Sequence, residues 1–225
     1  MPILDLQFAF FFANPPINLR FDEFSVNLRK KQIFIDNDLD LNTFIYPVPA
    51  EIPADFPRCQ ITSVDQIFDL TISGARCDVI VKNKLNSSVT TFKSILLEII
   101  ELFAQEKIEI NRIGYVTRYF TKTENPGLII REKFLKINDP DLQEPNIRFV
   151  FKTDFNGTMC NENYQIEVAQ QRNFKTATED NILLLTQDFN TIPENNSVLN
   201  KEFLESFMDN IPHDRLNNYF NLISE

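Results

Sequence analysis

One amphipathic helix in the middle of a strand-rich chain restricts the fold more than any other feature. Residues 91–105 place apolar side chains at the i, i+3 and i+4 positions of one helix face. These side chains are Phe92, Ile95, Leu96, Ile99 and Phe103. Ile100 and Leu102 widen the apolar stripe, so more than one side of the helix must be covered. We therefore expect it to pack against a sheet.

Runs with the two-residue alternation of β-strands lie on both sides of this helix. We expect strands over 4–12, 21–28, 32–41, 67–72, 77–81, 112–122, 128–137, 147–154, 164–170 and 182–189. The basic segment 29–31 and the Asn156-Gly157 pair are expected to form hairpin turns, the second because its residues tolerate positive φ. The proline-rich segment 46–57 cannot be a helix interior and is expected to be extended.

A second helical region is expected from about residue 200, interrupted at Pro212. Because no βαβ alternation occurs, the sequence predicts the α+β class. The expected fold is a curved antiparallel sheet built from hairpins, packed against a central helix and a C-terminal helix. We expect a single domain over residues 1–225, with a subdivision near 84–90 as the alternative.

The composition excludes many kinds of active site. The 225 residues include one histidine, four glycines and three cysteines, which removes most metal-centre, phosphate-loop and histidine-based catalytic designs. The odd, widely spaced Cys59, Cys77 and Cys160 suit reduced thiols in the cytoplasm. We therefore expect no cofactor, no metal and no enzymatic activity.

The acidic balance restricts the choice of partner. A net charge of −10 opposes attraction to nucleic acids and to anionic membranes. The acidic excess is concentrated in residues 176–225, which contain nine acidic and two basic residues. In the terminal helix we expect Phe203, Phe207 and Ile211 to face the sheet. The outward residues would then be Glu202, Glu205 and Asp209, which we expect to face a protein partner.

The strand NRIGYVTRYF contains the candidate ligand-binding residues Arg112, Arg118 and Tyr119. Two arginines and nearby aromatic side chains can clamp a carboxylate or phosphate. Strand alternation, however, puts both arginines on the side opposite Tyr119. The structural alternative is that Arg118 pairs with Glu132 or another carboxylate and that Gly114 marks a β-bulge.

Two other motifs lack the residues that a catalytic site or a calcium site would need beside them. His213 is the one side chain that would titrate near neutrality if unperturbed, but no nucleophile motif accompanies it. Asp36, Asp38 and Asp40 have the spacing that begins a calcium loop, yet the glycine and glutamate that complete such a loop are missing. We expect these aspartates to form the solvent-exposed face of an edge strand instead.

The same strand carries a resemblance to a known family. Arg112-Ile113-Gly114 followed by Arg118-Tyr119, and the later run ILLLTQDFN at 182–190, resemble a sporadically distributed bacterial family of proteins of unknown function. The similarity covers about residues 90–222, and the NPPI segment at 14–17 is similar to a lesser degree. The resemblance implies no catalytic residues. The patchy distribution of the family implies mobile or defence-related genes.

Two functions of different classes follow from these features. The first is a non-enzymatic protein-interaction module, a subunit or regulator in a bacterial defence or phage-conflict system. The alternative is a small-ligand-binding protein with a phenylalanine-lined pocket and Arg112 or Arg118 as the anchor. A gapless apolar interior would favour the first function, and a pocket would favour the second.

Overall fold

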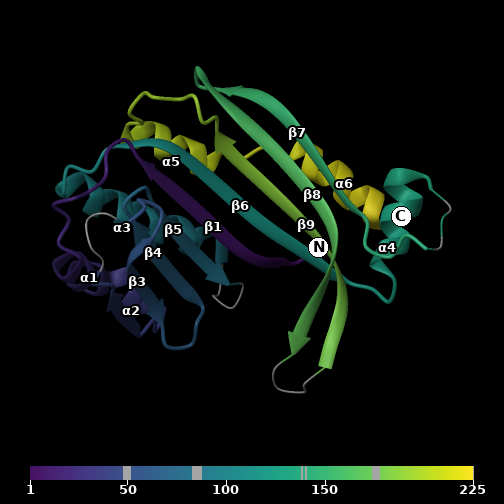
Figure 1. The fold of residues 1–225 in the computed structure, drawn as a ribbon, viewed down its shortest axis with the longest axis horizontal. Helices are drawn as coiled ribbons and strands as arrows, with labels where there is room; N and C mark the ends of the chain where they lie inside the picture. The colour runs from purple at the N-terminus through teal and green to yellow at the C-terminus, as the bar shows by residue number, and fades with distance from the viewer. Residues whose placement is uncertain (48–51, 83–87, 138, 140, 174–177, 225) are drawn as a thin grey trace.

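The computed structural model describes residues 1–47, 52–82, 88–137, 139, 141–173 and 178–224. These residues form one open, nine-stranded antiparallel sheet with the order β2-β3-β4-β5-β1-β6-β9-β8-β7 (Figure 1). The strands are β1 (Ile3–Phe12), β2 (Leu41–Ile45), β3 (Pro57–Ser63), β4 (Phe68–Ser73), β5 (Arg76–Lys82), β6 (Ile110–Lys122), β7 (Asn146–Phe155), β8 (Thr158–Asn173) and β9 (Thr178–Thr191). The helices are α1 (Phe21–Arg29), α2 (Gln32–Asp36), α3 (Ser88–Gln105), α4 (Pro126–Ile129), the π-helix η1 (Ile130–Leu135), α5 (Lys201–Asp209) and α6 (Asp214–Ser224). The predicted α+β class is confirmed.

The two halves of the chain repeat one order of elements. In the first half, β1 is followed by short helices, by the meander β2–β5 and by the helix α3. In the second half, β6 is followed by α4 and η1, by the meander β7–β9 and by α5 and α6. In each half, the last strand of the meander pairs with the first strand of that half: β5 pairs with β1, and β9 pairs with β6. The antiparallel pair of β1 and β6 joins the halves at the centre of the sheet (Figure 1).

The larger apolar core lies between the sheet and α3. Alternate residues of β1 are buried from Leu6 to Phe12, as strand periodicity requires. On α3, Phe103 is 1% exposed and its ring contacts the rings of Phe10, Phe12 and Phe24 at centroid distances of 5.6–5.7 Å. The predicted helix stripe is therefore buried on more than one side, by the sheet and by α1.

A second, smaller apolar cluster fills the space under α4, η1 and α6. Its buried members are Tyr119, Ile130, Tyr164, Ile166, Leu183, Leu185 and Leu216. The strand residues among them lie on the helix-covered face of the sheet, as Phe8 and Phe10 do. Both cores therefore share one face of the sheet, and no helix of the described chain packs into either cluster from the other face.

Several local predictions are confirmed. Asn156 and Gly157 have φ of 51° and 80° and connect β7 to β8 as a two-residue hairpin loop. The strands predicted over 67–72 and 77–81 are observed as the antiparallel pair β4 and β5. The C-terminal helical region divides into α5 and α6 on either side of Pro212. The predicted segments 112–122, 147–154, 164–170 and 182–189 all lie within observed strands.

The hairpin predicted over 21–41 is wrong, because this segment forms α1 and α2. Phe21, Phe24 and Leu28 are three and four residues apart, and the last two are buried against the core. This spacing is helical, and the apolar content of the segment masked it. Asp36 ends α2, and Asp38 has a φ of 52° in the turn that follows, so the predicted edge strand of aspartates is also absent.

The strand predicted over 128–137 is also wrong. Pro126 occupies the start of α4, and the Asn125 side chain accepts a hydrogen bond from the Leu128 backbone N–H at 2.9 Å. Proline in the first turn after an asparagine cap is a helix-start signal. The helix continues as η1 and ends at Lys136, which has left-handed φ and ψ.

Two predictions fall partly outside the described residues. The extended segment 46–57 includes residues 48–51, and the alternative domain boundary near 84–90 includes residues 83–87. The prolines of the first segment did not prevent β3 from beginning at Pro57, since a strand tolerates proline at its first position. In the described part of the chain, every helix is too short or too polar to cross a bilayer.

Candidate functional site

A row of polar side chains crosses the helix-covered face at the boundary between the two apolar clusters, and the ring of one member, Tyr164, belongs to the second cluster. Thr117 on β6, Gln187 on β9 and Tyr164 on β8 are partners in the strand register. Their exposed fractions are 4%, 1% and 0%. The next residues on the same face of β6 and β9, two positions away in either direction, are apolar or aromatic. The polar row therefore interrupts an otherwise continuous core. Alternation alone predicts an apolar side chain at position 187.

Hydrogen bonds extend this polar row toward the turn between α5 and α6. The Gln187 side chain donates to the Tyr164 hydroxyl at 3.3 Å and to the Pro212 carbonyl at 2.5 Å. Tyr164 donates in turn to Glu162, which is fully buried and also accepts from Arg215. Burial and the Glu162 hydrogen bond raise the pKa of the Tyr164 phenol. The Gln187 Oε1 atom has no partner among the described residues, and burying an unpaired polar group is costly.

At its β6 end the polar row opens into a groove of about 380 Å³ between α3 and α5. Tyr115, Thr117 and Tyr119 form the floor, because alternate residues of one strand point to the same face. Apolar side chains contribute the remainder of the floor and one wall. They are Ile3, Leu6, Met208 and Ile211.

The floor of the groove offers uncharged hydroxyls. Burial raises the pKa of Tyr115 and Tyr119, and hydrogen bonding with Thr117 offsets only part of that change. Both phenols are therefore protonated near neutral pH, and each can donate one hydrogen bond and accept others. The groove thus combines aromatic surface with hydrogen-bonding groups at its base.

The rim of the groove carries the charged groups. Lys93 on α3 forms an ion pair with Asp209 at the end of α5, across the mouth. His213 lies on the same rim and is exposed. Neither cysteine nor serine belongs to the described lining, and its hydroxyl groups are those of threonine and tyrosine.

The three predicted ligand-binding residues do not form one site. Tyr119 lines the groove, whereas Arg112 and Arg118 lie on the opposite, open face of the sheet. Arg118 forms an ion pair with Asp5 at 2.6 Å. The structural alternative is thus observed with Asp5, rather than Glu132, as the carboxylate.

Arg112 and Gly114 contact the neighbouring strands and do not line the groove. The Arg112 guanidinium lies over the Phe11 ring, 4.5 Å from its centroid, a cation–π geometry. Gly114 pairs regularly with Ala9, so it marks no bulge. A β-carbon at this glycine would lie 3.3 Å from the Asn190 β-carbon, a close approach between neighbouring strands.

The predicted acidic residues lie on α5 as expected. Glu202 and Asp209 are exposed and Glu205 is half-buried. The buried residues of the helix are Leu204, Phe207 and Met208. Asp209 pairs with Lys93, and Glu205 lies 3.7 Å from Lys201, so part of the acidic charge is already compensated. A partner-facing role for these residues stays a prediction.

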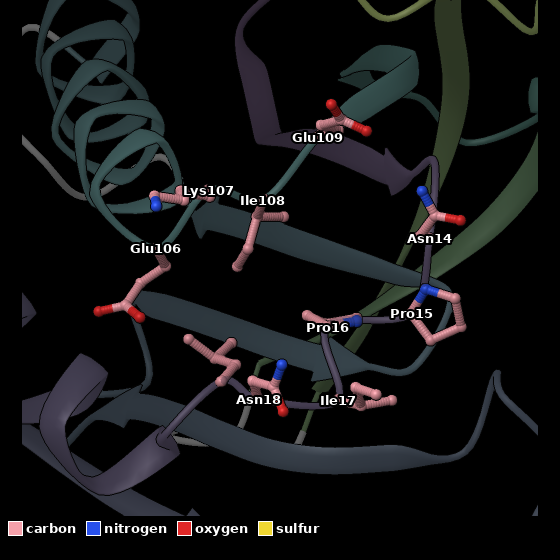
Figure 2. A pocket seen from close by; sticks show the side chains of 10 residues that line it. Asn14, Pro15, Pro16, Ile17, Asn18, Glu106, Lys107, Ile108 and Glu109 are labelled. Carbon is pink, nitrogen blue, oxygen red and sulfur yellow. The ribbon is translucent and has the colours of Figure 1, made fainter.

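Other hollows lie outside the groove. One of about 620 Å³ lies over β3, β4 and β5, where Gln60 donates a hydrogen bond to Asp69 at 2.7 Å, so these two lining groups already have partners. A hollow of about 180 Å³ lies between the NPPI turn and the connection from α3 to β6. Five of its ten lining residues are apolar, and Figure 2 shows that the polar ones, which include Asn14, Asn18 and Glu109, are spread around the rim. Within the described residues, no group of three or more histidine, cysteine or acidic side chains could hold a metal ion. We therefore take the groove as the candidate site.

The three cysteines should be unreactive in the folded protein. Cys59, Cys77 and Cys160 are buried, and burial raises the pKa of Cys59 to about 11 and that of Cys160 to about 12. Since the thiolate is the reactive form, Ellman's reagent at pH 8 should label none of them until urea unfolds the chain. Rapid labelling of a native thiol would contradict this expectation.

No protein-family model and no curated protein matches this chain. The resemblance to the bacterial family thus stays an expectation. Sequence reasoning found Tyr119 and Asp209 but missed Glu162, Tyr164 and Gln187. The signal that could have identified them is a polar residue at an inward position of an apolar strand, as in Leu183-Leu184-Leu185-Thr186-Gln187.

Proposed function

We propose that this protein is a non-enzymatic binding protein that takes a small molecule into the groove between α3 and α5. The observation that carries this proposal is the polar row, which crosses an otherwise apolar face and ends in the groove. Buried polar groups are costly and are commonly retained where they serve a site. The groove is an open hollow at the edge of the core rather than a cavity inside it, and its aromatic lining is Tyr115 and Tyr119 instead of the expected phenylalanines.

The lining indicates the kind of ligand. Leu6, Met208 and Ile211 offer apolar surface, while the floor hydroxyls offer donors and acceptors. A volume of about 380 Å³ suits a small molecule. We infer a ligand with an aromatic or aliphatic body and hydroxyl, carbonyl or amide groups. Lys93 replaces the arginines as the cationic group at the site, since Arg112 and Arg118 lie on the other face.

The non-enzymatic part of the proposal is supported by the composition of the rim. His213 is exposed, and the described lining of the groove contains neither a cysteine nor a serine for it to activate. The protein-interaction function on the acidic α5 surface has weaker support, because two of its three carboxylates are paired with lysines of this chain. The defence role rests on the family resemblance alone.

Filling the groove should abolish binding of an apolar probe. The probe is 8-anilinonaphthalene-1-sulfonate, an aromatic anion whose fluorescence rises in apolar sites. Thr90→Trp places a large side chain on the groove wall at an exposed helix position, and we expect at least about a tenfold loss of affinity, equivalent to about 1.4 kcal/mol. The affinity is measured by fluorescence titration.

The matched control is Ile35→Trp, since Ile35 is 56% exposed on α2 and lines no hollow described above. It should bind the probe as the parent protein does. If both tryptophan variants bind with unchanged affinity, the probe is elsewhere and the groove is not a ligand site. Circular dichroism checks that each variant is folded.

A further inference from the structure

The outermost strand β7 has a free edge that the proposed ligand site does not use. β7 pairs with β8 over all ten residues, from Asn146 to Phe155, without a register shift. In the described part of the chain, no other strand pairs with β7, and its residues take part in none of the backbone hydrogen bonds outside the ladders. Figure 1 shows it bordering the sheet. A regular edge exposes unpaired N–H and C=O groups to another strand.

The repeated order of the two halves makes this edge unusual. In the first half, β2 covers the outer edge of β3. β7 takes the position of β3 in the second half, two strands from the returning strand β9. No further strand covers it in the described chain. The second half is thus one strand short of the first at its outer edge.

The open-face residues of β7 carry a self-complementary charge pattern. They are Asn146, Arg148, Val150, Lys152 and Asp154, and all five are exposed. The row carries basic residues at its second and fourth positions, Arg148 and Lys152, and an acidic residue, Asp154, at its last position. An antiparallel copy of the same strand therefore brings opposite charges together in one register.

We propose that two copies of this chain pair antiparallel through β7, with the two-fold axis at Phe151. In this register Arg148 lies opposite Asp154 at two symmetric positions, and Val150 lies opposite Lys152. Directly opposite residues of an antiparallel pair are close enough for charge attraction or repulsion to select the register. Such a contact is isologous, as a closed two-fold dimer requires.

Neighbouring registers that keep the same faces together are disfavoured. A shift of two residues in one direction places Arg148 opposite Lys152, and a shift in the other places Lys152 opposite itself. A shift of one residue would put the exposed charges against the helix-covered face. The partner is therefore a second copy rather than an arbitrary extended peptide, because the charges of β7 match those of an antiparallel copy of the same strand.

Arg148 and Asp154 are available for this contact. Arg148 donates a long hydrogen bond of 3.3 Å to Asn163, and Asp154 accepts from the Gly157 backbone N–H at 3.1 Å. Neither forms an ion pair with the described residues of its own chain, although the Arg148 charge offsets part of the rise that burial causes in the pKa of Asp188. Dimerisation would join two nine-stranded sheets into one.

A charge swap tests the register directly. Dimer dissociation constants are measured by sedimentation equilibrium for the parent, Arg148→Asp, Asp154→Arg and the double variant. Each single variant places like charges opposite each other twice and should weaken the dimer about tenfold. The double variant exchanges the two charges and should restore the parent constant to within about threefold.

Arg20→Asp, on an exposed helix end distant in sequence, controls for net charge and should leave the constant unchanged. A parent protein that stays monomeric at every concentration overturns the proposal. So does a double variant that remains as weak as the single ones, because rescue depends on the register. Probe binding in the groove should be equal in all β7 variants, which separates this result from the proposed ligand function.

Discussion

Replacing Phe103 with alanine should lower the free energy of unfolding by about 3–5 kcal/mol. The Phe103 ring is 1% exposed and contacts three other phenylalanine rings from β1 and α1. Its removal leaves a cavity between three elements that cannot all close on it. The loss is a large fraction of the stability of a typical domain, and urea unfolding followed by circular dichroism measures it.

Phe44→Ala provides the matched control for this experiment. Phe44 lies on the edge strand β2 and is 62% exposed, so the same chemical change should alter the free energy of unfolding by less than about 1 kcal/mol. A comparable loss in both variants would mean that burial of the α3 stripe does not determine stability.

Replacing Arg215 with methionine should destabilise the protein by about 3 kcal/mol. Glu162 is fully buried, and Arg215 is the one cation paired with it among the described residues. Methionine keeps apolar bulk near Phe151, whose ring lies 4.3 Å from the arginine carbon Cζ, but leaves a buried carboxylate without its charge partner. The value is at the lower end of the range for buried pairs because Arg215 is partly exposed.

The double variant Glu162→Gln/Arg215→Met separates charge from packing. Glutamine keeps a hydrogen-bonding group for Tyr164 and removes the buried charge, so the double variant should recover at least half of the loss. Urea unfolding at neutral pH provides the comparison. If the double variant is no more stable than Arg215→Met, the unpaired charge of Glu162 is not the cause of the loss.

Local patterns predicted the elements whose signals were long or unambiguous. The α3 stripe extends over about three turns, and the alternation of β1 and β6 extends over many residues, so each has one consistent period. Asn156-Gly157 identifies its turn because its residues adopt positive φ at low cost. α1 and α2 were missed because short apolar segments fit both periods, and the Asn125-Pro126 helix start was overlooked.

The groove could be predicted only in fragments. Tyr119 and Asp209 were singled out separately, for different reasons, and the fold brings both to one groove with His213. Arg112 and Arg118 were separated from Tyr119 by the strand alternation itself, which the structure confirms. Glu162, Tyr164 and Gln187 form a row only once β8 and β9 are paired in register.

The sequence by itself determined the fold class, the central and C-terminal helices, most strand positions and the inward and outward faces of β6. These features depend on residues within a few positions of each other, where periodicity and turn chemistry act. Tertiary structure alone decided which strands distant in sequence are neighbours, which carboxylate pairs with Arg118, and where the polar row meets a groove. Those outcomes depend on pairings such as Asp5 with Arg118, which are 113 residues apart. Because the register of distant strands is set by the packing of the whole sheet, no local pattern contains it.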